Sequence, residues 1–293
     1  MPFARVDDLD IWYERSGGNK PTLVLTHGFA GPTNGWGPVI AEFKQRFDLV
    51  LYDVRAHGRT GMPPNLATVT VPRFAADMAG LLDALGIERA HIGGVSMGGM
   101  ISAQFACDFP DRALSLMLCD TTAGNRGGPD DAANAAERFL FDAFSKMAHV
   151  VEKYGMAGLV ERENRYRRDG DAYAHLQALP LDEQDAKNIR MKIDGMTAAG
   201  YLAANLALRE RPDLTSRTPL LPMPVLVSCG EWDDFYPCAR RDHALIPNSR
   251  LVTIRGAAHA TPDYTPELWK RAIFDFVAGV EAGHDIGGEI ELA

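Results

Sequence analysis

Short, largely apolar runs recur along the chain and are separated by longer stretches with turn signals and helical periodicity. The runs have four to six residues each and cover residues 22–26, 49–52, 90–95, 114–119, 225–228 and 251–254. Strands buried between two helix layers have this composition, because neither of their faces meets water. Strands that alternate with helices predict right-handed crossovers and a mostly parallel, doubly wound α/β sheet. Ahead of them, β-favouring residues on both sides of Asp7 and Asp8 predict an opening hairpin over residues 3–15.

The alternation stops between residues 119 and 225, where no comparable strand run appears. Helix starts are predicted near residues 129–131 and 182–185, and residues 198–209 have a third helical pattern. Because the flanking strands are expected to be sheet neighbours, we interpret residues 122–220 as a helical cap. The core domain then comprises residues 1–121 and 221–282, and residues 283–293 are predicted to form a flexible tail. A second independent domain is the alternative interpretation of the helical segment.

Composition and charge narrow the possible partners. The chain has 293 residues, of which 46% are hydrophobic and 24% charged, as in a folded protein with a core. Its formal net charge of −9 disfavours binding to nucleic acid or anionic lipid, since both require a positive field. The N-terminus shows no signal peptide, and no apolar run is long enough for a membrane span. We therefore expect a cytoplasmic protein that binds a small molecule, either as a monomer or as a homodimer.

The sequence offers no support for a cofactor or a metal. The four cysteines have no close C-x-x-C spacing and the eight histidines form no H-E-x-x-H motif, so neither disulfides nor a zinc site is expected. Walker A and G-x-G-x-x-G loops are also absent from the sequence. The predicted chemistry therefore relies on side chains alone.

The strongest chemical signal is a serine between two glycines. Gly94, Ser96 and Gly98 form a G-x-S-x-G motif that directly follows residues 90–93 of a strand run and precedes a helical stretch over residues 99–109. A serine at such a turn is lifted out of the sheet edge, and small residues on both sides let the chains approach closely. The Met97 N–H then lies at the positive end of the next helix, where it can hold an oxyanion.

A serine nucleophile requires a general base and a carboxylate that orients it. His259 lies just past the last strand run, where open parallel sheets place their ligand sites. For the acid, Asp233 and Asp234 follow the strand run 225–228. Being adjacent, they point in different directions, so only one of them can face the histidine.

Five segments together resemble the α/β-hydrolase superfamily over nearly the whole chain, in its serine hydrolase branch. They are residues 26–29, 53–58, 94–99, 230–237 and 258–259. The resemblance implies that Asp233, three residues after Gly230, is the acid of a catalytic triad. Asp120 is a competitor, because some members of the superfamily carry the acid at that strand end. The resemblance also implies that the Phe29 N–H is a second oxyanion donor beside that of Met97.

Two shorter segments, residues 96–101 and 118–121, resemble the enol-lactone hydrolases in particular. A serine nucleophile implies acyl chemistry, whereas dehalogenase and epoxide-hydrolase relatives carry aspartate at this position. We expect an enzyme that cleaves a small, mainly apolar carboxylic ester or lactone through an acyl-enzyme on Ser96. The alternatives are hydrolysis of a carbon–carbon bond in a ring-cleavage diketone and a non-catalytic receptor for a small ligand.

Aromatic residues near the motifs and in the cap are candidates for the substrate pocket, since apolar ligands bury their surface against such side chains. The candidates are Trp36, Phe139, Tyr154 and Trp232. His27, Asp53, Arg55 and His57 are interpreted as structural residues of tight turns and strand ends.

Overall fold

The protein is built around one nine-stranded sheet in the order β1-β2-β4-β3-β5-β6-β7-β8-β9. The computed structural model describes residues 2–31, 33–124, 131–169, 183, 186, 189 and 192–293. The central strands are β3 (Thr22–Thr26), β4 (Asp48–Tyr52), β5 (Ala90–Val95), β6 (Ala113–Cys119), β7 (Val225–Gly230) and β8 (Ser249–Ile254). These six strands pair with one another in parallel, whereas β4 pairs with β2 (Leu9–Arg15) in antiparallel fashion. The predicted α/β fold with a mostly parallel sheet is therefore confirmed.

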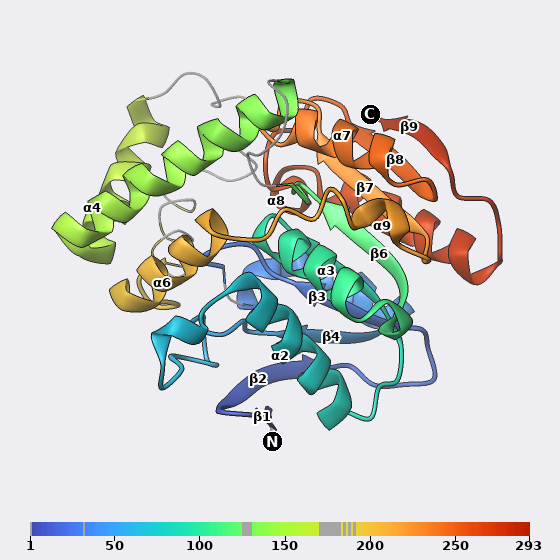
Figure 1. The fold of residues 1–293 in the computed structure, drawn as a ribbon, viewed down its shortest axis with the longest axis horizontal. Coiled ribbons are helices and arrows are strands. Elements are labelled where there is room, and N and C mark those ends of the chain that lie inside the picture. Colours follow the sequence, from blue (N-terminus) through green and yellow to red (C-terminus); the bar gives the residue numbers. More distant parts are fainter. Residues whose placement is uncertain are drawn as a thin grey trace.

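Helices cover both faces of the sheet (Figure 1). One face packs against α2 (Val71–Ala84), α3 (Met97–Asp108) and α7 (Tyr236–Leu245), and the other against α1 (Ile40–Arg46) and α9 (Pro266–Glu281). Side chains alternate between the two layers: Val24 lies in the first, whereas Leu23 and Leu25 lie in the second. This double burial is the reason that the strand runs are apolar at consecutive positions.

The two edges of the sheet carry the two ends of the chain. The predicted hairpin is present, because β1 (Phe3–Val6) and β2 (Leu9–Arg15) pair in antiparallel fashion. The prediction of a flexible tail over residues 283–293 is wrong. β9 (Gly288–Leu292) pairs in parallel with β8, and Ile286 and Leu292 are buried, so these contacts hold the last residues against the sheet.

Helices α4 (Ala132–Asp169) and α6 (Ala198–Arg209) pack together between β6 and β7 in the sequence, although these two strands are hydrogen-bonded neighbours. Figure 1 shows helices α4 and α6 next to each other at one side of the sheet. A break in α4 occurs at Gly155, whose φ is 67°. Most residues of the helix starts predicted at 182–185 and 129–131 lie outside the described residues.

Buried polar contacts tie this helical segment to the sheet. The Glu137 carboxylate of α4 pairs with Arg211, and its other oxygen lies 3.6 Å from Arg241 of α7. Asp242 accepts the Ala123 N–H at 2.7 Å, just after β6. These contacts fix where the chain leaves the sheet and where it returns, so they set the position of α4 above the strand ends.

No helix within the described part of the chain is both long and apolar enough for a bilayer crossing.

Candidate active site

Ser96 occupies the turn between β5 and α3 in a strained conformation. Its φ is 57° and its ψ is −119°, outside the regions that L-residues favour. Two hydrogen bonds secure the turn: the Ser96 N–H donates to the Cys119 carbonyl at 2.9 Å, and the Thr121 side-chain hydroxyl donates to the Ser96 carbonyl at 2.7 Å. Strain of this kind persists only where the surroundings over-determine it, and it is concentrated at functional sites.

The glycines around Ser96 are required by close packing. A Cβ on Gly98 would collide with the Thr26 carbonyl, and a Cβ on Gly94 would collide with the backbone of Gly98. The G-x-S-x-G spacing therefore allows α3 to start directly against the ends of β3 and β5. Met97 is the first residue of α3, so its N–H has no acceptor within the helix.

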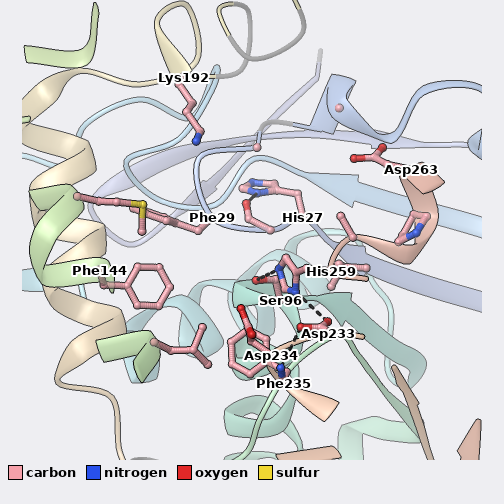
Figure 2. A pocket seen from close by; sticks show the side chains of 18 of the residues that line it. His27, Phe29, Ser96, Phe144, Lys192, Asp233, Asp234, Phe235, His259 and Asp263 are labelled. Carbon is pink, nitrogen blue, oxygen red and sulfur yellow. Dashed lines mark hydrogen bonds and ion pairs between the residues drawn. The ribbon is translucent and has the colours of Figure 1, made fainter. Parts of the chain in front are cut away.

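The structure brings Ser96, His259 and Asp233 together from three separate loops. His259 Nε2 lies 3.1 Å from Ser96 Oγ, and His259 Nδ1 lies 2.9 Å from Asp233 Oδ2. The other Asp233 oxygen accepts the Phe235 N–H at 2.9 Å. Figure 2 shows the imidazole between the hydroxyl and the carboxylate. A protonated Nδ1 donating to Asp233 leaves Nε2 free to accept the serine proton.

The two competing aspartates, Asp120 and Asp234, have other surroundings than Asp233. Asp120, at the end of β6, is fully buried, and its carboxylate accepts hydrogen bonds from Thr261 and not from His259. Asp234 is exposed at the cavity wall, and burial together with the neighbouring Asp233 charge raises the pKa of its carboxyl. Of the three candidates, Asp233 is the carboxylate in contact with the imidazole.

The loop after β3 runs beside the nucleophile. A Cβ on Gly28 would lie 3.6 Å from Ser96 Cβ, so the Gly28 and Phe29 backbone borders the serine. His27 is buried and has a structural role: its Nδ1 lies 2.9 Å from the Gly28 carbonyl, and its Nε2 accepts the Val54 N–H at 3.0 Å. Burial lowers the pKa of this imidazole, which keeps it neutral.

Asp53 is also structural. Its two carboxylate oxygens accept the N–H groups of Thr33 at 2.6 Å and of Arg59 at 2.8 Å. It thus anchors the segment that follows the Phe29 loop. These bonds explain a charged residue at a buried strand end without any catalytic role.

A cavity of about 410 Å³ opens above Ser96. Phe29 forms one wall, with its ring centroid 5.8 Å from Phe144 and 4.7 Å from Tyr201. Leu140, Phe144 and Met147 of α4 also line the cavity, and their spacing of four and three residues places them on one helix face. Figure 2 shows Phe29 and Phe144 on the same side of Ser96.

Of the four aromatic residues predicted to line the pocket, the structure places only Trp36 there, stacked on Trp269 at 5.7 Å. Phe139, Tyr154 and Trp232 are 58%, 59% and 49% exposed and are not among the lining residues. Phe139 precedes the cavity-facing Leu140 by one position, which turns it about 100° away on the helix. Tyr154 lies seven residues beyond Met147, about 10 Å along the helix. These three predictions were wrong.

The family model for the α/β hydrolase fold matches residues 21–264. The chain belongs to the α/β hydrolase family. A Bacillus subtilis protein provisionally named 2-succinyl-6-hydroxy-2,4-cyclohexadiene-1-carboxylate synthase is 26% identical over 88% of this chain and 90% of its own length. An Azorhizobium caulinodans protein provisionally named carbamate hydrolase RutD is also 26% identical, over 96% of this chain and all of its own length.

Among solved structures, the enol-lactonase from Burkholderia xenovorans LB400 has a TM-score of 0.75 at 24% identity, with 94% of this chain and all of that chain covered. The resemblance to the superfamily that the motifs predicted is thereby confirmed. The chain is an α/β-hydrolase-type enzyme. Its relatives are named for different reactions, so membership of the family leaves the substrate to be inferred from the site.

In this α/β hydrolase the charges around His259 favour its protonated form. Burial lowers the pKa of the imidazole, but the negative charges of Asp233, Asp120 and Asp234 together outweigh burial and raise it. About 44% of the His259 side chain is exposed to the cavity, so solvent screens part of this attraction. The pKa of His259 therefore lies above its usual value near 6.5.

This shift predicts the pH dependence of catalysis. For a general base at His259, which must be neutral to accept a proton, the raised pKa would cause activity to be lost as the pH falls below an inflection above 6.5. The measurement is kcat/KM for a p-nitrophenyl ester across about pH 5 to 9, which reports the pKa of the free enzyme. A plateau already complete at pH 6.5 would contradict the shift.

Within the described residues, one buried group has the spacing of metal ligands, formed by Asp120, Cys229 and Asp233 with ligand atoms within 4.8 Å of one another. Its donors are poorly suited to a cation. The Asp233 carboxylate is hydrogen-bonded to His259 Nδ1 and the Phe235 N–H, and the Asp120 carboxylate accepts hydrogen bonds from Thr261. Burial, followed by the charges of Asp233 and Asp120, raises the pKa of the Cys229 thiol far above its usual range. Since thiolates and not thiols bind metals, this cluster fits the hydrogen-bonding roles of its members.

Proposed function

We propose that this chain is a serine hydrolase that cleaves a small, mainly apolar carboxylic ester or lactone. Ser96 Oγ attacks the carbonyl carbon while His259 Nε2 takes the hydroxyl proton. The tetrahedral intermediate then expels the alkoxide, which receives that proton, and an acyl-enzyme on Ser96 remains. Water activated by His259 releases the acid and restores the serine. Asp233 stabilises the imidazolium in both steps.

The observation that carries this proposal is the continuous hydrogen-bonded line from Ser96 Oγ through His259 to Asp233, with distances of 3.1 and 2.9 Å. These are the contacts by which a base activates a serine and an acid orients the base. In the same proposal, the backbone N–H groups of Phe29 and Met97 form the oxyanion hole. The position of Gly28 against Ser96 and the start of α3 at Met97 support these two donors.

The size and lining of the cavity support a small apolar substrate. A volume of about 410 Å³ is at the lower end for ligand pockets, and its walls include Phe29, Leu140, Phe144 and Tyr201. The cationic Lys192 also borders the cavity, but it forms an ion pair with Glu163. The polar residues that line the cavity include Ser96, His259 and Asp233, together with Asp234 and Asp263.

A panel of substrates tests the substrate class. We expect turnover of p-nitrophenyl acetate and butyrate and of short aliphatic lactones, with p-nitrophenyl laurate much slower because its chain exceeds the cavity. The panel also includes a carbamate, since the RutD relative is named for that activity, and a ring-cleavage diketone. Exclusive turnover of the carbamate or of the diketone would overturn the assignment to esters and lactones.

Covalent labelling separates an enzyme from a receptor with the same fold. A fluorophosphonate is expected to add to Ser96, with the mass increase located on the peptide that contains residues 94–99. The His259→Ala variant should label far more slowly, because no base remains to accept the serine proton. If Ser96 stays unlabelled under conditions where an established serine esterase reacts, the receptor becomes the better explanation.

A further inference from the structure

A second buried carboxylate lies behind the proposed triad. Asp120 directly follows β6, is 0% exposed, and has a φ of 47°. Its Oδ2 accepts two hydrogen bonds from Thr261, from the backbone N–H at 2.7 Å and from the hydroxyl at 2.8 Å. Its Oδ1 accepts the Gly230 N–H at 3.4 Å. The mechanism proposed above uses none of these contacts.

The two partners of Asp120 belong to the two loops that carry the acid and the base. Gly230 ends β7, and its carbonyl accepts the Asp233 N–H at 3.1 Å. Thr261 follows His259 by two residues and begins the short helix α8 (Thr261–Tyr264). The intervening Ala260 has a left-handed conformation, with a φ of 66°. One carboxylate therefore joins both loops at points within three residues of the groups that must meet.

We propose that Asp120 is a positioning residue, whose buried carboxylate holds the Asp233 loop and the His259 loop at the separation that the hydrogen bond between Asp233 and His259 requires. The inference rests on the proposed function, because it assigns to Asp120 a role in aligning that triad. The donors all point at Asp120, so its ionised form is the one that satisfies them. A displacement of about 1 Å at a reacting group is enough to lower a rate by about 10²-fold.

The charge of Asp120 costs the fold stability. Carboxylate oxygens of Asp120 and Asp233 lie within 4.8 Å of each other. The charged groups that act on Asp120 are Asp233 and His259, and the neutral thiol of Cys229 lies beside them. Burial, then the Asp233 charge, raises the pKa of Asp120 to about 7. A pKa above the unfolded value means that the folded state disfavours the ionised form, so this group contributes less to stability as the pH rises through 7. A buried carboxylate that served only stability would have a pKa below its unfolded value, and its ionised form would stabilise the fold.

The test is the Asp120→Asn variant, which keeps the shape and tolerates the positive φ. With p-nitrophenyl acetate we expect kcat to fall about 10²-fold with KM nearly unchanged, while the midpoint of thermal unfolding at pH 8.5 stays equal or rises. The acid limb of the kcat/KM profile should also move to lower pH, because one charge that raises the pKa of His259 is gone. The rate of fluorophosphonate labelling at Ser96 should fall in parallel with kcat.

Thr261 variants provide a second, independent test. Thr261→Val removes only the hydroxyl donor and is expected to lower kcat about tenfold. Thr261→Ser keeps this hydroxyl and should have a kcat close to wild type. In the double variant Thr261→Val/Asp120→Asn, the loss of kcat should not exceed that of Asp120→Asn alone, since both substitutions weaken the same contact between Asp120 and Thr261. Should Asp120→Asn fail to fold, a wild-type kcat in Thr261→Val would overturn the proposal.

Asp48→Asn is the matched control. Asp48 is a buried aspartate at the opposite end of the sheet, where it accepts the Gly17 N–H at 2.7 Å and pairs with Arg15. This variant should lose stability but keep its kcat. The proposal is wrong if Asp120→Asn stays within twofold of wild-type kcat, or if it loses stability and activity together with an unmoved pH profile. Failure of the proposed function would look different, because the wild-type enzyme would then show no labelling at Ser96.

Discussion

Replacing Ser96 with alanine is expected to lower kcat for p-nitrophenyl ester hydrolysis by about 10⁶-fold, the loss seen when the nucleophile of a triad is removed. The reason is chemical: without Oγ no acyl-enzyme forms, and His259 has no hydroxyl to activate at 3.1 Å. Binding of the substrate should persist, because alanine leaves the cavity walls in place. Steady-state kinetics and labelling with a fluorophosphonate measure the two consequences.

Ser115→Ala is the control for this prediction. Ser115 is also a buried serine in contact with a histidine, since its Oγ lies 2.8 Å from His91 Nδ1. It lies in the middle of β6, away from the strand ends that carry the site. The Ser115→Ala variant should retain wild-type kcat per folded molecule. If Ser96→Ala keeps more than a tenth of wild-type activity, Ser96 is not the nucleophile.

The sequence predicted the positions of Ser96 and His259 because both depend on the backbone path. A parallel sheet brings the carboxyl ends of its strands to one edge, so residues that directly follow strand runs gather there. The strain at Ser96 and the close approach of Gly98 to Thr26 leave a visible motif, since larger residues do not fit. Local sequence therefore contains enough information to find the turn that carries Ser96.

The choice among the three aspartates needed more than local sequence. Asp233 and Asp234 share one turn, and which of them faces His259 depends on the bond between Asp233 Oδ1 and the Phe235 N–H. Only the resemblance to the hydrolase family favoured Asp233 over Asp234. The role of Asp120 was equally hidden, because its partner Thr261 lies 141 residues away in the sequence.

The pocket predictions failed for a related reason. Aromatic residues in α4 identify a helix that packs somewhere, but the face that meets the cavity is set by how the helix is rotated on the sheet. The triplet Leu140, Phe144 and Met147 has the spacing of a single helix face and was the available signal.

The last strand, β9, also had a signal in the sequence, since E-I-E-L at residues 289–292 alternates between polar and apolar residues as edge strands do.

Replacing Asp233 with asparagine is expected to lower kcat by about 10⁴-fold while the fold remains intact. Asp233 Oδ2 accepts a hydrogen bond from His259 Nδ1–H at 2.9 Å, which leaves Nε2 free to act as a base. An asparagine can turn its amide toward Nδ1 and donate to it. The imidazole then carries its proton on Nε2, facing Ser96, and accepts nothing from the serine. The lost carboxylate also leaves the imidazolium of the transition state without its closest counter-charge.

Asp233→Asn, Asp234→Asn and Asp120→Asn should be assayed side by side, with circular dichroism to verify folding. The expected order follows from their contacts. Asp233 touches the base, Asp120 holds the loops on which acid and base lie, and Asp234 contributes only its charge at the cavity wall. The losses should therefore be about 10⁴-fold for Asp233, about 10²-fold for Asp120 and less than about tenfold for Asp234. A large loss in Asp120→Asn or Asp234→Asn with Asp233→Asn near wild type would reassign the acid, because a carboxylate that holds the catalytic tautomer is not replaceable by an amide.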